Sequence, residues 1–224
     1  MNYRNIRARA RESLRGNWGV SVGATFVAAI FGALLISSGD ILEVTMKYTQ
    51  QFTPRIAAVL GLITSAISAI SILKLVLGGV VQLGYSRFLL AQHDGYEYGI
   101  RDLFTQFERF TVGFLQLFLR ILFTFLWMLL LIVPGFIKSL SYAMTPFLLA
   151  EHPELTANQA IRRSMELMDG HKWDLFVLGL SFIGWDLLNA LTLGIGSFWL
   201  NPYKNAAYAA FYREITSGQK YIAD

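Results

Sequence analysis

Apolar residues in this chain form long runs that are separated by short polar segments rich in arginine. The first run extends from Gly16 to Gly39 without a charged residue, directly after a block of arginines. A helix needs roughly 20 predominantly apolar residues to cross the hydrocarbon core of a bilayer. The pattern therefore predicts membrane-spanning helices. The predicted spans are residues 19–38, 60–83, 111–133, 136–150, 175–195 and 198–212.

Turn residues arrange these spans as three hairpins. Pro134 and Gly135 are predicted to separate the third span from the fourth, because proline is tolerated in the first turn of a helix but not in its interior. Gly194 and Gly196 are predicted to open the turn before the last segment, which is weakly hydrophobic, so five and six spans both remain open. The sequence predicts an all-α transmembrane bundle of about six spans, with residues 1–224 as a single integral membrane domain.

The N-terminal segment, residues 2–15, has the spacing of an amphipathic helix. Tyr3, Ile6, Ala10 and Leu14 fall on one face, and arginines lie beside it. This pattern is typical of a helix that lies in the membrane interface, with its apolar face in the lipid and its arginines on the phosphates. A solvated basic tail is the alternative.

A second amphipathic segment covers residues 156–169. Thr156 and Gln159 have the spacing of a capping box, and Gly170 is a suitable C-terminal stop. We expect a helix on the cytoplasmic surface.

Composition supports the membrane interpretation. Hydrophobic residues make up 54% of the 224 residues and charged residues only 15%, whereas an average soluble domain has about 25% charged residues. The chain has no cysteine, which excludes disulfides and thiolate metal sites. The first apolar run is longer than the roughly 7–15 residues of a signal-peptide core, so we expect it to be retained.

The distribution of basic residues predicts the orientation. With the N-terminus inside, only Lys47, Arg55, Lys138 and Lys204 of the 19 lysines and arginines fall on the outer side, and two more lie within spans. All the others fall on the cytoplasmic side, as the positive-inside rule requires. We therefore expect a multi-pass protein of the bacterial cytoplasmic membrane with a cytoplasmic N-terminus.

The net charge of +4 is attributed to lipid binding. Basic residues group at the ends of apolar runs, which favours anionic lipid headgroups over nucleic acid as the partner. Trp18 and Trp173 are predicted to anchor the depth of their helices at the cytoplasmic interface, and Trp199 to mark the opposite one. The candidate headgroup contacts are Arg4, Arg7, Arg11, Arg15, Trp18, Arg162, Arg163, Lys172 and Trp173.

Four polar residues are predicted to lie within the membrane: Lys74, Arg120, Asp186 and Asn189. An ionisable residue at that depth costs roughly 2.5–3.5 kcal/mol on insertion scales, so a functional role is the default. Arg120 is placed near the cytoplasmic start of its span, where we expect it to extend to the headgroups in a structural role. Lys74 is deeper and is expected either to pair with Asp186 or to face a wet cavity.

Catalytic motifs are absent from the sequence. It contains no phosphate-binding glycine loop, no nucleophile elbow and no HExxH pattern. His152 and His171 share a cytoplasmic loop with acidic residues but lack a recognised ligand spacing. We expect no enzyme activity, no metal and no cofactor.

Several sequence blocks carry a family resemblance. They are Leu131–Lys138, Ser141–Tyr142, Leu149–Leu155, Ala160–Ser164, Leu167–Phe176, Leu180–Trp185, Leu191–Gly196 and Asn201–Tyr203. Together they resemble a bacterial family of integral membrane proteins catalogued as domain of unknown function nine hundred seventy-five. More distantly, they are similar to the membrane domain attached to some glycerophosphodiester phosphodiesterases, which is not their catalytic part. The resemblance implies a membrane architecture and supplies no reaction; Lys74 departs from the family pattern.

These observations favour a non-enzymatic integral membrane protein that interacts with lipid, or with a membrane-protein partner or second copy of itself, at the cytoplasmic face. The alternative is a small transporter or channel, with a polar path lined by Lys74, Asp186, Asn189 and Asn201. An enzyme that acts on lipid headgroups through His152 and His171 is the third hypothesis.

Overall fold

The computed structural model describes residues 3–30, 74, 76–192 and 194–220, and every regular element in this part of the chain is helical. The predicted all-α class is confirmed. In chain order the elements are α1 (Tyr3–Leu14), α2 (Trp18–Ile30), the helical residues 76–94, the short 3-10 helices η1 (Ile100–Phe104) and η2 (Phe107–Arg109), α5 (Phe110–Leu130), α6 (Ile132–Ser141), α7 (Thr145–Glu151), α8 (Ala157–Leu167), α9 (Lys172–Leu180), α10 (Ile183–Leu191) and α11 (Ser197–Lys220).

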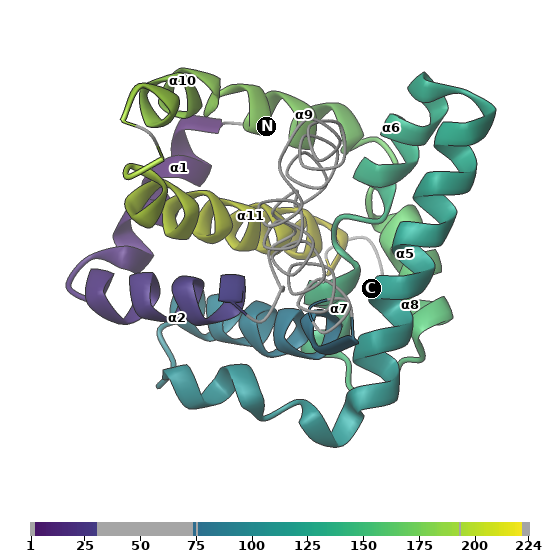
Figure 1. The fold of residues 1–224 in the computed structure, drawn as a ribbon, viewed down its shortest axis with the longest axis horizontal. Helices are drawn as coiled ribbons and strands as arrows, with labels where there is room; N and C mark the ends of the chain where they lie inside the picture. The colour runs from purple at the N-terminus through teal and green to yellow at the C-terminus, as the bar shows by residue number, and fades with distance from the viewer. Residues whose placement is uncertain (1–2, 31–73, 75, 193, 221–224) are drawn as a thin grey trace, which may run out of the picture.

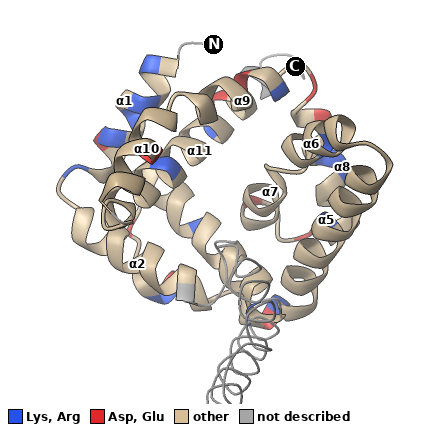
Figure 2. Cartoon of the chain, turned by 45° about the horizontal axis from the view of Figure 1, so that its top comes forward, with Lys and Arg blue, Asp and Glu red and all other residues tan. Residues whose placement is uncertain are grey.

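The helices form two groups that are joined into a ring (Figures 1 and 2). In one group α11 contacts α1, α2 and α10, and in the other α5 contacts α6 and α8, with α7 packed on α8. Helix α9 reaches from the first group to α6 along one side of the ring. The helical residues 76–94 lie along the opposite side.

Helix α11 forms the core of the first group. Its alanines Ala206, Ala207, Ala209 and Ala210 are buried together with the aromatic residues that follow them. Small side chains allow neighbouring helices to approach closely. The sequence predicted a sixth span at residues 198–212, and this segment is indeed helical, but α11 is not among the helices that are long and apolar enough to span a membrane.

Helix α1 matches the predicted amphipathic segment, but protein covers its apolar face. Ile6, Ala10 and Leu14 are at most 1% exposed, and α1 packs directly on α11. The expectation that this face lies in lipid is therefore corrected. The sequence pattern is the same for either environment, because burial under a helix and burial in lipid both require one apolar stripe.

Three helical segments in the described part of the chain are long and apolar enough to cross a membrane: Ile100–Leu130, Ile132–Glu151 and Lys172–Leu191. They correspond to the predicted spans 111–133, 136–150 and 175–195. Much of their surface is apolar and exposed. Extensive exposed apolar surface marks contact with lipid or with other proteins.

The first two predicted spans lie only partly within the described residues. Helix α2 begins the predicted span 19–38 and is apolar from Trp18 to Ala29, and the remainder of that span is outside the described part. Most of the predicted span 60–83 is also outside it. Its described part, from residue 76 onward, is helical and continues to residue 94.

The break between α5 and α6 lies earlier than predicted. Leu131, with an extended backbone (φ −157°, ψ 134°), separates the two helices, and Pro134 lies in the first turn of α6. The ring of a proline clashes with the carbonyl group four residues before it, which here is that of Leu130. Helix α5 therefore has to end at Leu130 rather than at Pro134.

The start of α8 confirms the predicted capping box. The Gln159 backbone N–H donates to Thr156 Oγ1 (3.4 Å), and the Thr156 backbone N–H donates to Gln159 Oε1 (2.9 Å). Gly170 follows with φ +79°, a left-handed conformation that favours glycine.

Two glycines set the crossing of residues 76–94 with α5. A Cβ atom built on Gly79 meets the carbonyl oxygen of Gly113 at 2.1 Å, and one built on Gly113 meets Val80 Cα at 2.8 Å. Next to this contact, Gln116 Nε2 donates to the Gly79 carbonyl (3.4 Å). The two helices are therefore in direct backbone contact at this point.

Candidate functional site

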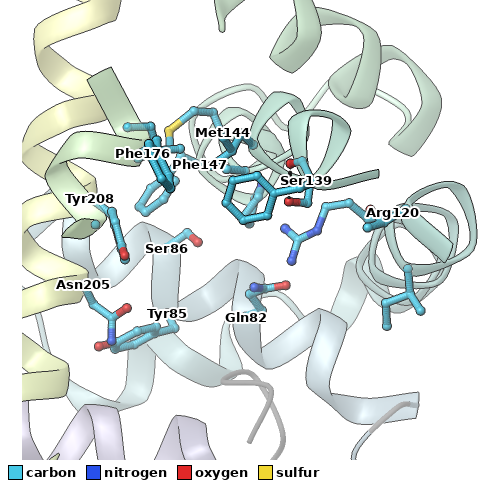
Figure 3. A pocket seen from close by; sticks show the side chains of 18 of the residues that line it. Gln82, Tyr85, Ser86, Arg120, Ser139, Met144, Phe147, Phe176, Asn205 and Tyr208 are labelled. Carbon is cyan, nitrogen blue, oxygen red and sulfur yellow. Dashed lines mark hydrogen bonds between the residues drawn. The ribbon is translucent and has the colours of Figure 1, made fainter. Parts of the chain in front are cut away.

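A cavity of about 780 Å³ lies inside the ring of helices (Figure 3). Its walls come from residues 76–94, α5, α6, α7, α9 and α11. Ligand sites in proteins typically have volumes of about 300–1,000 Å³ and mostly apolar walls. Large apolar side chains, including Phe125, Met128, Phe136, Phe147 and Phe176, form most of this lining.

Among the described residues that line this cavity, Arg120 is the only cation. It lies at the middle of α5, and its guanidinium group points into the cavity between Ser139 and Gln82 (Figure 3). Within the described part of the chain it forms no ion pair and no hydrogen bond. Ten residues of helix, about 15 Å, separate it from either end of α5. The expectation that Arg120 extends to the headgroups stays a prediction.

A second, smaller hollow of about 350 Å³ combines arginines with tryptophans. We call it the Arg–Trp groove; its lining includes Arg7, Arg11, Trp18, Trp185 and Trp199. These residues come from α1, α2, α10 and α11, so the packing of α1 on α11 assembles the groove.

Arg7 is held in a fixed position at the Arg–Trp groove. Its Nε donates to the Tyr203 hydroxyl (3.2 Å), and its guanidinium carbon lies 5.2 Å from the centre of the Phe182 ring. A cation over an aromatic face is attracted by the ring quadrupole. Arg11, one helical turn farther along α1, is exposed. One arginine is thus fixed by the protein and the other faces outward.

Asp186 and Asn189, two of the intramembrane polar residues predicted from the sequence, have different surroundings. Asp186 accepts two hydrogen bonds from Lys204 Nζ, at 2.6 and 2.7 Å, so the predicted pairing of Asp186 with Lys74 is replaced by this contact. Asn189 lies instead in the Arg–Trp groove, where its Oδ1 is buried without a hydrogen-bond partner among the described residues.

A cluster of ionic groups joins three distant segments. Arg213 on α11 donates to Asp94 Oδ2 and to Glu151 Oε1, both at 2.5 Å, and the Tyr212 hydroxyl donates to Glu151 Oε2 (2.5 Å). Burial alone lowers the pKa of Arg213, but the hydrogen bonds to Glu151 and Asp94 outweigh it, so the pKa is raised. The cluster holds Arg213 in its charged form.

Further polar contacts hold α1 to its neighbours. Arg9 pairs with Glu214 (2.5 Å), and the Tyr3 hydroxyl donates to Asp174 Oδ1 (2.8 Å). The hydrogen bond to Asp174, together with burial, raises the pKa of Tyr3. The beginning of α1 is thereby linked to α9, and its middle to α11.

Comparison with known protein families finds a match in the C-terminal part of the chain. Residues 115–219, slightly less than half of the chain, match the family described as Protein of unknown function (DUF975). The resemblance predicted from the sequence is thereby confirmed for this region. No curated protein and no solved structure matches the chain. The more distant similarity to the membrane domain of phosphodiesterases has no support from these comparisons and stays a prediction.

The DUF975 region supplies most of the cavity wall. It contains Arg120 and the whole of α6, α7 and α9, whereas residues 76–94 lie outside it. The Arg–Trp groove, in contrast, is divided, because Trp185 and Trp199 lie in the DUF975 region and the two arginines and Trp18 do not.

The predicted headgroup residues fall into four sets. Arg7, Arg11 and Trp18 line the Arg–Trp groove. Arg162 and Arg163 are exposed on α8, in the other group of helices. Lys172, which pairs with Asp169 (3.2 Å), and Trp173, which is exposed, lie at the start of α9. Arg4 and Arg15 are exposed on α1.

The sequence analysis missed the contribution of Trp185 and Trp199 to the groove. It placed Trp199 at the opposite interface from Trp18, whereas both line the same hollow. No local signal in the sequence indicates this, because the proximity depends on how α1, α2, α10 and α11 pack together.

The two loop histidines lie in separate ion pairs. His152 Nδ1 is 3.2 Å from Glu154 Oε1, and His171 Nδ1 is 3.3 Å from Asp174 Oδ2. Among the described residues, no group of three or more histidine or acidic side chains is arranged to hold a metal ion.

Proposed function

We propose that this chain is a non-enzymatic, multi-pass protein of the bacterial cytoplasmic membrane whose Arg–Trp groove holds an anionic lipid headgroup at the cytoplasmic interface. The observation that supports this most directly is the convergence of Arg7 and Arg11 with Trp18, Trp185 and Trp199 around one hollow. Tryptophan is enriched at the headgroup level of membranes, and arginine forms strong, charge-assisted hydrogen bonds with phosphate.

The two arginines have complementary roles in this proposal. Arg7 is oriented by Tyr203 and Phe182, so little side-chain entropy is lost when it contacts a phosphate. Arg11 is exposed and adds a second positive charge at the mouth of the groove. The tryptophan rings provide the apolar contact for the upper part of the acyl chains.

Polar contacts between segments support a cytoplasmic location for this end of the molecule. The Arg7–Tyr203 hydrogen bond then requires the start of α11, with Lys204, to lie on that side and not on the outer side that the charge count gave it. The pairs Tyr3–Asp174 and Arg9–Glu214 join segments that the positive-inside rule assigns to the same side. The Arg213 cluster does the same for the segments that contain Asp94 and Glu151. A topology that puts any of these segments on the outer side has to break these contacts.

The test uses the full-length protein in lipid nanodiscs and measures the quenching of tryptophan fluorescence by brominated lipids. We expect brominated phosphatidylglycerol to quench more than brominated phosphatidylcholine. The excess should shrink strongly at about 0.5 M salt, because the attraction is screened. Replacing Arg11→Gln should remove most of the excess, whereas Arg101→Gln, an exposed arginine of η1, should leave it unchanged. Equal quenching by the two lipids would falsify the proposal.

A further inference from the structure

The cavity inside the ring of helices is independent of the Arg–Trp groove and has a different chemistry. We propose that it is a lipid-binding site, in which the acyl chain of an anionic membrane lipid occupies the apolar cavity and the acidic headgroup pairs with Arg120. Charge, shape and access each support this assignment.

The charge of Arg120 calls for an anionic ligand. Its guanidinium group faces the cavity, and none of the described residues gives it a carboxylate or a hydrogen bond. Guanidinium groups bind phosphate and carboxylate through paired hydrogen bonds. Because the cation lies at the middle of α5, a partner that brings both a negative charge and an apolar body suits this position.

Polar groups next to Arg120 extend this headgroup site. Gln82 Oε1 accepts a hydrogen bond from Gln116 Nε2 (3.4 Å), and within the described residues the Gln82 amide nitrogen donates to no other group. Figure 3 shows Gln82 and Ser139 on either side of the guanidinium group. An acidic oxygen at Arg120 is therefore within reach of a second donor.

The shape of the cavity suits a hydrocarbon chain. Beyond Arg120, the aromatic side chains Phe147 and Phe176 line the space toward Tyr208 and Asn205 on the opposite wall (Figure 3). A volume of about 780 Å³ with mostly apolar walls is large for an ion or a small polar metabolite.

Access is from the membrane side. The lining residues Phe125, Met128, Phe136 and Leu180 are also among the exposed large apolar side chains, and all four belong to helices that are apolar enough to span a membrane. An apolar rim of this kind allows an acyl chain to enter from the bilayer, and the charge of Arg120 offsets the desolvation of the acidic headgroup.

The experiment measures binding to the full-length protein in detergent by native mass spectrometry. The probes are lysophosphatidylglycerol, lysophosphatidylcholine with the same chain, and inorganic phosphate. We expect lysophosphatidylglycerol to bind at least about tenfold more tightly than either other probe, and Arg120→Gln to remove that difference. Arg101→Gln is the control and should bind as the unaltered protein does. Equal affinity for the two lysolipids, or tight binding of phosphate alone, overturns the proposal.

A second pair of variants tests the cavity without removing the charge. A Cβ atom on Gly179 meets no atom within 4 Å, and Gly179 lines the cavity, so Gly179→Leu fills space in the cavity without a clash of its Cβ. A Cβ atom on Gly184 also meets no atom within 4 Å, but this residue lies outside the cavity lining. We expect Gly179→Leu to weaken lysophosphatidylglycerol binding roughly tenfold and Gly184→Leu to leave it unchanged. Equal binding by both variants contradicts the proposal.

The results for the cavity can be distinguished from those of the quenching experiment on the Arg–Trp groove. Arg11→Gln leaves Arg120 and the cavity lining intact, so lysophosphatidylglycerol affinity at the cavity should not change. Arg120→Gln in turn should leave the salt-sensitive quenching of the groove tryptophans unchanged. Loss of both signals in either single variant indicates one shared site and overturns the cavity assignment.

Discussion

Arg213 joins three segments that are distant in the sequence. Its two carboxylate partners come from the end of the helical residues 76–94 and from the end of α7, more than 60 residues away in sequence. The side chain of Arg213 is only 24% exposed, as is that of Asp94, so this interaction is screened less than a surface ion pair.

Replacing Arg213→Met should therefore destabilise the protein by about 1–3 kcal/mol, because two carboxylates lose their shared charged donor. The measurement is thermal unfolding of the detergent-solubilised protein, followed by tryptophan fluorescence. Arg9→Met is the matched control. The Arg9 side chain, which pairs with Glu214, is 55% exposed. We therefore expect Arg9→Met to lower the free energy of unfolding by only about 0–1 kcal/mol. Equal losses contradict this ranking.

Sequence reasoning identified which polar residues stand in apolar surroundings but not their partners. Asp186 and Lys204 lie on opposite sides of the turn between α10 and α11, so the folding of that turn brings them together. The predicted Lys74–Asp186 pair instead relied on depth in the membrane alone. Arg120 was recognised as a charge within a span, but the cavity beside it depends on six segments and has no signature in any one of them.

At the scale of elements, α1 shows how far an amphipathic pattern can be interpreted. The helix and its apolar face were predictable from the spacing of Ile6, Ala10 and Leu14. Whether lipid or protein covers this face was not predictable, since contact with lipid and contact with the alanines of α11 require the same stripe of apolar residues on α1. The capping box and Gly170 were predictable because they depend only on local chemistry.

Helix α1 should behave as part of the protein core. Ile6→Ala should lower the free energy of unfolding by about 2–4 kcal/mol, because it leaves a cavity against α11. The control is Leu187→Ala on α10, whose side chain is 65% exposed and which should change stability little. Both are measured by denaturation of the purified protein in detergent. An unchanged stability for Ile6→Ala favours the original expectation of a lipid-facing helix.

At the scale of the whole molecule, the all-α class and the approximate positions of three helices that could span a membrane were predictable, because composition and run length determine them directly. The count of six was not established. The last predicted span became a buried central helix, which shows that a helix of low hydropathy can be enclosed by more apolar neighbours.

The polar contacts between α1 and α11 predict that both ends of the described chain face the same side of the membrane. Because the chain has no cysteine, single cysteines can be labelled without background. We expect Glu12→Cys and Ser217→Cys to react with a membrane-impermeant maleimide only in inverted vesicles, and Val133→Cys, at the exposed α5–α6 turn, not to react there. Labelling of Glu12→Cys and Ser217→Cys from opposite sides rules out this topology.

The contact between Gly79 and Gly113 determines how wide the lipid cavity can be. Ser86 lies two turns beyond Gly79 on the same helical face, and Arg120 lies two turns beyond Gly113 on α5. The backbone contact at the glycines therefore sets the spacing of the two helices that carry these cavity-lining residues. A methyl group at either glycine pushes the two helices apart. Two residues that do not contact the ligand therefore determine the width of the cavity opening and the thickness of the chain that fits.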